Sequence, residues 1–331
     1  MNWRKISILA VLSFAGFILA NRFIMRKPQN NLSPIRIAIP NLYSSSLMIL
    51  AQEKGIFKKN GIDVTLDTFN YGKECIDEML KNKYDFSLAY ITPIAKKIHG
   101  GDKFLILTEF HNSSDNTFLI YRRNLPTETG EDPIIRQVGL VKDTNAEFLL
   151  SLFAETKAID FKKLKVVNAE KTDQLELDLL SGKLESAIFW QPKASKLLAK
   201  HPKILSRMDM PFYTDISLLI GNNQFIDNHN TETDLLIKSI VEAKTYFDSS
   251  PEQANKIVLT YIKESLDVLN TDVLSGINID PRLSQIMVVM LESEIRWLSK
   301  KKFKFIKQLN KEEFIRKKYL EKYLPSKVTF Q

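Results

Sequence analysis

Cysteine is almost absent from this chain of 331 residues, which contains only Cys75. A single thiol excludes an internal disulfide and any cysteine-rich metal site. Cys75 falls in one apolar spacing with Ile76, Met79 and Leu80, which is typical of a small buried side chain on a helix. The four histidines are scattered without metal-ligand spacing. We therefore expect no metal and no cofactor.

Motifs of catalysis and of nucleic-acid binding are also missing. The sequence shows no paired carboxylates, no Ser/His/Asp arrangement at a recognisable spacing and, with 11 glycines, no glycine-rich phosphate loop. The 47 basic and 39 acidic residues give a net charge of +8, and the tail over 300–327 is rich in basic residues. Such a tail is typical of a solvated helix surface, with an anionic membrane surface or nucleic acid as the alternatives. No RNA- or DNA-binding fingerprint accompanies it, so nucleic acid is not an expected partner.

The one long apolar run lies at the start of the chain. Arg4 and Lys5 precede an apolar or small run from Ile6 to Ala20, which is the pattern of a secretory signal. The run is shorter than the roughly 20 residues of a spanning helix. We expect residues 1–33 to be an export signal or N-terminal anchor with a linker, so that the protein is periplasmic or otherwise extracytoplasmic. Cleavage, membrane tethering through residues 6–20, and a core helix of a cytoplasmic protein are the alternatives.

Two units of alternating strands and helices follow, and they resemble each other. The first ends in "DFSLAY" at Tyr90 and the second in "ESAIFW" at Trp190, each with a proline soon after. The two units are nearly equal in length. Strands that alternate with helices favour parallel pairing with right-handed crossovers. The sequence therefore predicts an α/β fold of two lobes, each a mostly parallel sheet flanked by helices, with a cleft between them.

Two apolar segments are expected to connect the lobes. "TFLIYRRN" leads out of the first lobe and "DISLLIGNN" leads back, which is the arrangement of a hinge. We predict a first lobe over residues 34–121, a second lobe over 122–215, and a return to the first lobe with C-terminal helices over 216–331.

The ends of the strands indicate where a ligand binds. In open α/β sheets, ligands lie beyond the carboxyl ends of the strands, where helix N-termini also favour anions or carbonyls. The positions expected there are Tyr43, Ser44, Ser45, Tyr90, Asp143, Thr144, Asn145 and Trp190. Plain helix capping is a compatible explanation for the hydroxyl and amide residues. For Trp190 alone, packing in the core is the alternative.

The stretch Glu109-Phe110-His111 is the best candidate for chemistry, because a histidine beside a cleft can act as a base. The interpretation that we prefer is that Phe110 and His111 line the pocket.

A family resemblance rests on long stretches of both units. "AQEKGIFKKNGIDVTLDTFNYGKECIDEMLKNKYDFSLAYITP" and "VGLVKDTNAEFLLSLFAETKAIDFKKLKVVNAEKTDQLELDLLSGKLESAIFWQP" resemble the two lobes of the substrate-binding proteins that serve ABC importers for nitrate, sulfonates, taurine and thiamine-pyrimidine precursors. The resemblance implies the type 2 periplasmic binding fold, a ligand in the cleft, and docking of the loaded protein on a membrane permease.

The resemblance also implies site residues, namely Ser44, Ser45, Tyr90, Thr92, Thr144, Asn145 and the Trp190-Gln191-Pro192 stretch. Asp143 stands where the family has a glycine, which disfavours a small anion. Gln191 replaces an acidic residue, so one charge that would recognise a cationic group is missing.

The predicted function is an extracytoplasmic solute-binding protein that is not an enzyme. It would capture a small organic molecule, sulfonate-like or thiamine-precursor-like, and deliver it as a monomer to an ABC permease in the inner membrane. One alternative is a membrane-anchored sensor or accessory protein. Another is an enzyme on the same fold, although the related thiamine-pyrimidine synthases carry a cysteine-rich motif that this chain lacks.

Overall fold

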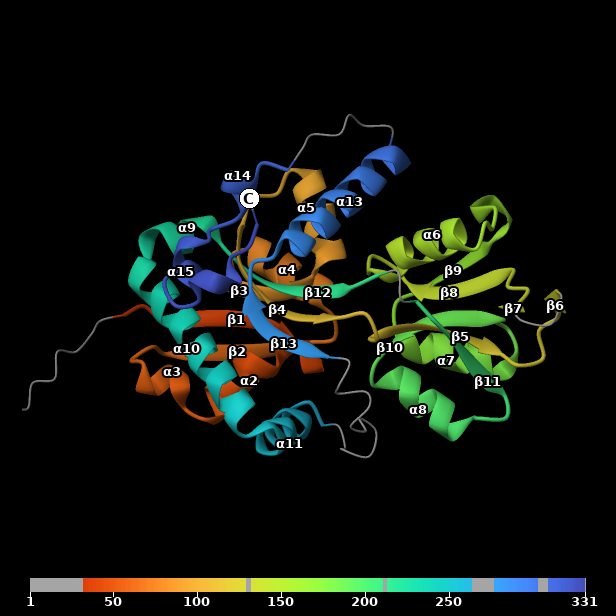
Figure 1. The fold of residues 1–331 in the computed structure, drawn as a ribbon, viewed down its shortest axis with the longest axis horizontal. Helices are drawn as coiled ribbons and strands as arrows, with labels where there is room; N and C mark the ends of the chain where they lie inside the picture. Colours follow the sequence, from red (N-terminus) through yellow and green to blue (C-terminus); the bar gives the residue numbers. More distant parts are fainter. Residues whose placement is uncertain (1–31, 129–131, 211–212, 264–276, 303–308, 331) are drawn as a thin grey trace, which may run out of the picture.

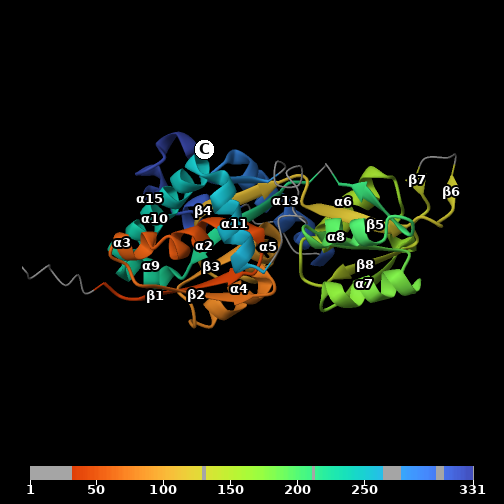
Figure 2. The ribbon, with the colours of Figure 1, turned by 90° about the horizontal axis from the view of Figure 1, so that it is seen from below.

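The computed structural model describes residues 32–128, 132–210, 213–263, 277–302 and 309–330. The predicted signal or anchor over residues 6–20 lies outside these ranges. Figure 1 shows two sheets side by side, each flanked by helices, as two lobes. Figure 2 shows from below that the two lobes are joined by narrow connections.

The first lobe contains a sheet of six strands in the order β13-β4-β12-β3-β1-β2. The strands are β1 (Ile35–Pro40), β2 (Val64–Phe69), β3 (Phe86–Tyr90), β4 (Leu105–Ser113), β12 (Asp215–Gly221) and β13 (Asn278–Arg282). β1 pairs in parallel with β2 and β3, whereas β12 is antiparallel to β3 and β4. Central strands such as β1 are almost wholly buried because helices cover both faces of the sheet.

The second lobe repeats this arrangement with five strands in the order β11-β5-β10-β8-β9. They are β5 (Thr117–Arg122), β8 (Gln137–Val141), β9 (Lys165–Ala169), β10 (Ser186–Trp190) and β11 (Leu205–Asp209), with a separate hairpin of β6 (Thr127–Glu128) and β7 (Asp132–Pro133). The parallel trio β10-β8-β9 corresponds to β3-β1-β2 of the first lobe. In the first lobe, β12 enters from the second lobe and lies antiparallel to β3. In the second lobe, β5 enters from the first lobe and lies antiparallel to β10.

Helices cover both faces of the first sheet. They are η1 (Tyr43–Ser45), α2 (Ser46–Glu53), α3 (Ile56–Lys59), α4 (Gly72–Leu80), α5 (Ile91–Gly100), α9 (Asn223–Asn228), α10 (Asn230–Ser249), α11 (Pro251–Tyr261), α13 (Gln285–Lys302), α14 (Lys311–Phe314), α15 (Lys318–Glu321) and η3 (Pro325–Lys327). α5 and α13 lie together on one side, and α2, α3 and α11 lie on the other (Figure 1). α2 ends just before Gly55, whose left-handed φ of 64° suits a glycine at this position.

The second lobe has α6 (Ala146–Thr156), η2 (Phe161–Lys163), α7 (Thr172–Ser181) and α8 (Lys193–Lys200). At the start of α6, the Glu147 carboxylate accepts a hydrogen bond from the Asp143 backbone N–H at 2.9 Å. The N-cap residue Asn145 makes no side-chain capping bond, so only the carboxylate half of a capping box is present here. Asp143 takes a left-handed φ of 63°, which is uncommon for a residue other than glycine.

Strand pairing locates the two points at which the chain crosses from one lobe to the other. Residues Thr117 to Tyr121 pair with β10 and β11, so the chain enters the second lobe between Ser113 and Thr117 rather than after residue 121. It returns at Asp215, which pairs with Ser113. The return segment, expected to be mainly helical, also supplies β13 at the edge of the first sheet.

One glycine sets how closely a helix approaches the first sheet. A Cβ on Gly72 would lie 2.8 Å from the Cα of Ala89 on β3. Only glycine permits this contact between the start of α4 and β3. The N-terminus of α4 is thereby held at the carboxyl end of the strands, where the lobes meet.

Candidate functional site

A cavity of about 70 Å³ lies between the two lobes. Both lobes contribute to its wall. Its lining residues are Leu42, Tyr43, Ser44, Tyr71, Gly72, Lys73, Tyr90, Pro93, His111, Asn116, Asp143, Thr144, Asn145, Trp190, Gln191, Pro192 and Ile277. Four aromatic side chains are among them, and they come from three segments of the first lobe and one of the second.

Helix N-termini converge on this cavity from both lobes. The cavity is lined by the first residues of α4, by residues at the start of α5 and by the residues just before α2, α6 and α8. In these five helices, the N-cap residue makes no side-chain capping hydrogen bond. Two first-turn N–H groups are already bonded, that of Ala146 to the Thr144 hydroxyl at 3.4 Å and that of Ser195 to the Gln191 side-chain oxygen at 3.3 Å. The other N–H groups and the positive ends of the dipoles favour a ligand with anionic or acceptor atoms.

Most of the residues predicted from the sequence line the cavity, namely Tyr43, Ser44, Tyr90, His111, Asp143, Thr144, Asn145, Trp190 and Gln191. Ser45, Thr92 and Phe110 are buried beside the cavity and do not line it. The Ser45 hydroxyl donates to the Pro40 carbonyl at 2.7 Å, and Phe110 packs in the core of the first lobe. Thr92 is fully buried in the first turn of α5.

A β-bulge explains why Glu109 and His111 lie on opposite faces of the sheet. Glu109 pairs with Leu218 and His111 with the adjacent Ser217, so Phe110 is an extra residue on β4. The bulge sends Glu109 and His111 to opposite faces, although simple alternation would place them on the same face. His111 therefore reaches the cavity alone.

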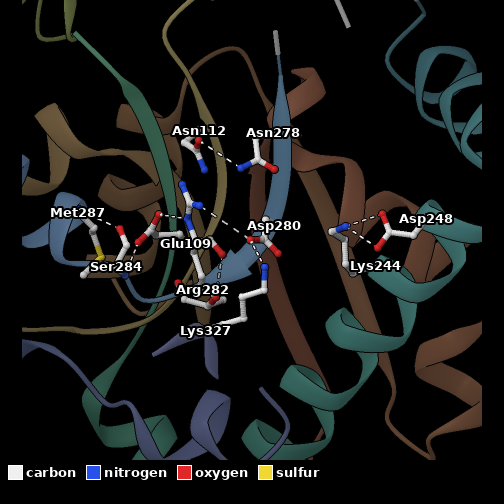
Figure 3. Close-up of polar contacts among 11 residues, drawn as sticks. Glu109, Asn112, Lys244, Asp248, Asn278, Asp280, Arg282, Ser284, Met287 and Lys327 are labelled. Carbon is white, nitrogen blue, oxygen red and sulfur yellow. Dashed lines mark hydrogen bonds and ion pairs between the residues drawn. The ribbon is translucent and has the colours of Figure 1, made fainter. Parts of the chain in front are cut away.

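Glu109 takes part in a different set of contacts on β13 (Figure 3). Its carboxylate accepts from the Arg282 guanidinium at 3.1 Å and from the Ser284 backbone N–H at 2.6 Å. Asp280 in turn pairs with Lys327 at 2.8 Å, close to the C-terminus. Glu109 is fully buried, and burial raises its pKa although the bonds from Ser284 and Arg282 oppose this. Glu109 thus fastens β13 to β4 and takes no part in the cavity.

The His111 imidazole is a neutral polar group in the cavity wall. Burial lowers its pKa to about 3, so it carries no charge at neutral pH. Its Nδ1 atom is buried without a hydrogen-bond partner among the described residues. Its ring meets the Tyr90 ring edge-to-face, with centroids 6.0 Å apart. A group with these properties can donate or accept one hydrogen bond, but it is a poor general base.

Trp190 lies at the end of β10 with a half-buried indole. Its Nε1 atom donates to Asn145 Oδ1 at 2.9 Å. On the side of the first lobe its ring meets Tyr71, with centroids 6.4 Å apart. The indole therefore forms part of the wall between the lobes, and it packs on the second lobe's core as well. Trp190 therefore lines the cleft with one part of its ring and packs against the core with another.

A buried carboxylate lies directly behind the cavity. Asp215 is 1% exposed and accepts hydrogen bonds from the side chains of Asn116, Thr117 and Asn145. Burial raises its pKa to about 6, although these three hydrogen bonds oppose the shift. Burial, and then the charge of Asp215, raise the pKa of the Tyr90 hydroxyl.

Contacts across the rim hold the lobes together. Lys96 of α5 pairs with Asp143 at 3.0 Å and with Glu147 at 3.2 Å. Burial raises the pKa of Asp143, but the hydrogen bond and charge of Lys96 outweigh this and leave the pKa below its ordinary value. Lys73 donates to the carbonyl of Lys142 at 3.0 Å.

Several lining residues were not expected from the sequence, chiefly Tyr71, Lys73, Asn116 and Ile277. Tyr71 and Lys73 follow the second strand of the first unit. That strand ends at the same edge of the sheet as the first and third strands, so parallel pairing could have indicated them. Asn116 lies in the crossing segment, and Ile277 precedes the strand β13 that the sequence did not reveal.

Two features are absent from the described ranges. Within these ranges, no group of three histidine, cysteine, aspartate or glutamate side chains is placed to hold a metal ion. No helix there combines the length and hydropathy that a membrane crossing requires.

Comparisons with known proteins agree on the fold. A protein of Brucella abortus (strain 2308) named as a binding protein is 21% identical over 269 residues, which are 80% of this chain and 82% of that protein. The periplasmic aliphatic sulphonate binding protein SsuA from Escherichia coli matches with a TM-score of 0.70 at 13% identity, over 86% of this chain and 93% of that one. The periplasmic nitrate-binding protein NrtA from Synechocystis PCC 6803 matches with a TM-score of 0.65 at 12% identity, over 89% of each chain.

These structures confirm the predicted two-lobed periplasmic binding fold and the resemblance to periplasmic binding proteins for sulphonate and nitrate. The family model described as "NMT1/THI5 like" matches residues 44–254, which is more than half of the chain. The chain therefore belongs to the NMT1/THI5 like family.

Proposed function

We propose that this protein is an extracytoplasmic solute-binding protein that captures a small organic molecule between its lobes and delivers it to an ABC permease. The observation that carries this proposal is the cavity at the junction of the lobes, where five helix N-termini and four aromatic side chains meet. The export pattern over residues 1–33 and the periplasmic binding proteins among the structural neighbours support it.

The residues that line the cavity favour a ligand with a flat or apolar part and with acceptor atoms. Tyr43, Tyr71, Tyr90 and Trp190 supply ring surfaces, and the helix N-termini supply donors. The Tyr43 hydroxyl is bound to Asn255 of α11, which leaves its ring as the contact surface. An organosulfonate or a thiamine-pyrimidine precursor has such a combination of groups.

Nitrate fits this site less well than an organic molecule. The Asp143 carboxylate is 54% exposed at the start of α6, where a small anion would approach the helix N-terminus. The negative charge of Asp143, although it is paired with Lys96, opposes the approach of an anion. The aromatic walls would also remain without a partner, because nitrate has no apolar part.

Binding of an organic ligand requires the lobes to move apart. The cavity between the lobes has a volume of about 70 Å³. A cavity that holds benzene has a volume of roughly 150 Å³, about twice as large. The two crossing segments, between β4 and β5 and between β11 and β12, are the places where such a hinge would bend. Lys96, Asp143 and Glu147 would then re-form their ion pairs when the lobes close on the ligand.

The geometry at His111 supports binding without turnover. The histidine is neutral, and the nearest acid in the sequence, Glu109, lies on the other face of the sheet. Cys75 is buried on α4 and does not itself line the cavity. None of these groups forms a pair of nucleophile and base.

A thermal-shift screen of the full chain tests the proposal. The panel should contain taurine, ethanesulfonate, nitrate and 4-amino-5-hydroxymethyl-2-methylpyrimidine. We expect one of the organic compounds to raise the melting temperature and to be recovered unchanged after long incubation. Conversion of the compound into a product, or no stabilisation by any organic member, would contradict the proposal.

A further inference from the structure

Asp215 occupies a special place in the chain. It is the first residue of β12, at the point where the chain re-enters the first lobe. Its carboxylate accepts from the Asn116 amide at 3.0 Å and from the Thr117 hydroxyl, and both of these residues belong to the other crossing. It also accepts from the Asn145 amide at the start of α6. One buried side chain therefore joins the two crossings to the ligand-facing end of the second lobe.

These bonds fix the orientation of two amides in the cavity wall. The NH₂ groups of Asn116 and Asn145 both turn to Asp215. The carbonyl oxygen of Asn145 then faces the other way and accepts from the Trp190 indole at 2.9 Å. Asn116, Asn145 and Trp190 all line the cavity.

An ionised carboxylate satisfies all of these donors without carrying a donor of its own. A carboxylate accepts at both oxygens and donates at neither, whereas an amide or a protonated acid carries a donor on one side. In Asp215→Asn that donor opposes the NH₂ group of Asn116 or of Asn145, so one of these amides must turn over. A protonated Asp215 can instead direct its O–H to the Thr117 hydroxyl, and then it loses only its charge. If Asn145 turns, its NH₂ group meets the indole N–H of Trp190 and that hydrogen bond is lost.

We propose that Asp215 is the positioning residue of the cleft, which holds the amides of Asn116 and Asn145, and through Asn145 the indole of Trp190, in the orientation that a ligand meets. The existence of a ligand rests on the proposed function. The positions of the side chains rest on the hydrogen bonds alone. Asp215 acts through its neighbours and lies behind the cavity wall.

Titration of Asp215 gives this proposal a pH signature. The titratable groups that face it are Tyr90 on β3, Tyr213 on the crossing segment and Glu294 on α13, and His111 lies beyond Tyr90. Burial raises the pKa of the first three, and the charge of Asp215 adds to this. The values are about 8 for Glu294, about 3 for His111 and about 6 for Asp215. Within this set, only Asp215 changes charge near pH 6.

The test is the indole N–H resonance of Trp190 in the ¹⁵N-labelled full chain without ligand. Trp190→Phe assigns the signal among the three tryptophans. We expect Asp215→Asn to move this resonance upfield, because Asn145 either turns over or loses the charged acceptor that polarises its amide. Trp297 is an internal control, because its indole donates to Ser151 of α6 at 3.2 Å rather than to Asn145. Its signal should stay in place.

The wild-type chain supplies a second measurement should Asp215→Asn fail to fold. Its Trp190 signal should move in the same direction as the pH falls through about 6, and Glu294→Gln should keep this transition. A Trp190 signal that is unchanged in Asp215→Asn, or that shows no transition near pH 6, would overturn the proposal.

Ligand binding separates this inference from the proposed function. For the organic member of the panel that stabilises the wild type, we expect Asp215→Asn to lower the affinity about tenfold. Unchanged affinity despite a moved resonance would refute a role in recognition. A panel without any stabilising compound would instead refute the proposed function, while the resonance still decides the geometry.

Discussion

A buried glutamate on α13 should make the stability of this protein depend on pH in a defined way. Glu294 is fully buried, and its carboxylate accepts from the Tyr213 hydroxyl at 3.0 Å. Burial raises its pKa from 4.5 to about 8. The folded state therefore holds the proton more tightly than the unfolded state. Its stabilising contribution is complete below pH 4.5 and is lost as the pH rises through about 8.

The magnitude follows from the two pKa values. A difference of one pKa unit corresponds to roughly 1.4 kcal/mol, so ionising Glu294 in the folded protein costs about 5 kcal/mol in full. Between pH 5 and pH 9 the loss is about 4 kcal/mol. Glu294→Gln keeps the acceptor for Tyr213 and does not titrate. The free energy of unfolding of the variant, relative to wild type, should therefore rise by about 4 kcal/mol between pH 5 and pH 9.

Urea denaturation followed by circular dichroism at pH 5 and pH 9 measures this difference. Asp215 also titrates in this range, but its contribution is common to both proteins and largely cancels in the comparison. Glu292→Gln is the matched control, because Glu292 lies on the same helix and is only half-buried. A stability difference between Glu294→Gln and wild type that is the same at both pH values would refute the reasoning.

Three further substitutions address the cleft. Trp190→Ala should weaken ligand binding at least tenfold by calorimetry, with a smaller effect on the unliganded melting temperature; the reverse pattern would assign Trp190 to the core. Lys96→Met removes two ion pairs between the lobes and should lower ligand affinity about fivefold, whereas Lys97→Met, which breaks a pair within the first lobe, should not. Gly72→Ala forces α4 away from β3 and should cost about 1–3 kcal/mol in urea denaturation. Gly100→Ala, which meets only an ordinary contact, is its control, and equal effects would refute the close approach.

The sequence predicted the fold well because the pattern is repeated. Each unit carries its own strands, helix starts and stops, so the end of β3 at Tyr90 and the end of β10 at Trp190 indicate equivalent positions. Parallel pairing then places both residues at one edge. By contrast, β13 is short, lies at the edge of the sheet and contains Pro281, which weakens any strand pattern.

The site was harder to predict in detail because it depends on non-local contacts. The bulge at Phe110 arises from pairing with β12, far away in the sequence, and no local pattern reveals which of Glu109 and His111 faces the cleft. Asp215 looks like the polar start of an apolar strand. Its role appears only when Asn116 and Asn145 are placed beside it.

Native mass spectrometry of the full chain, purified gently from its own host, tests most directly whether the cleft holds a small organic ligand. We predict a one-to-one complex with a small molecule in the wild type and the bare chain in Trp190→Ala. The unbound mass alone in the wild type, or equal retention of the molecule by both proteins, would contradict a ligand site between the lobes.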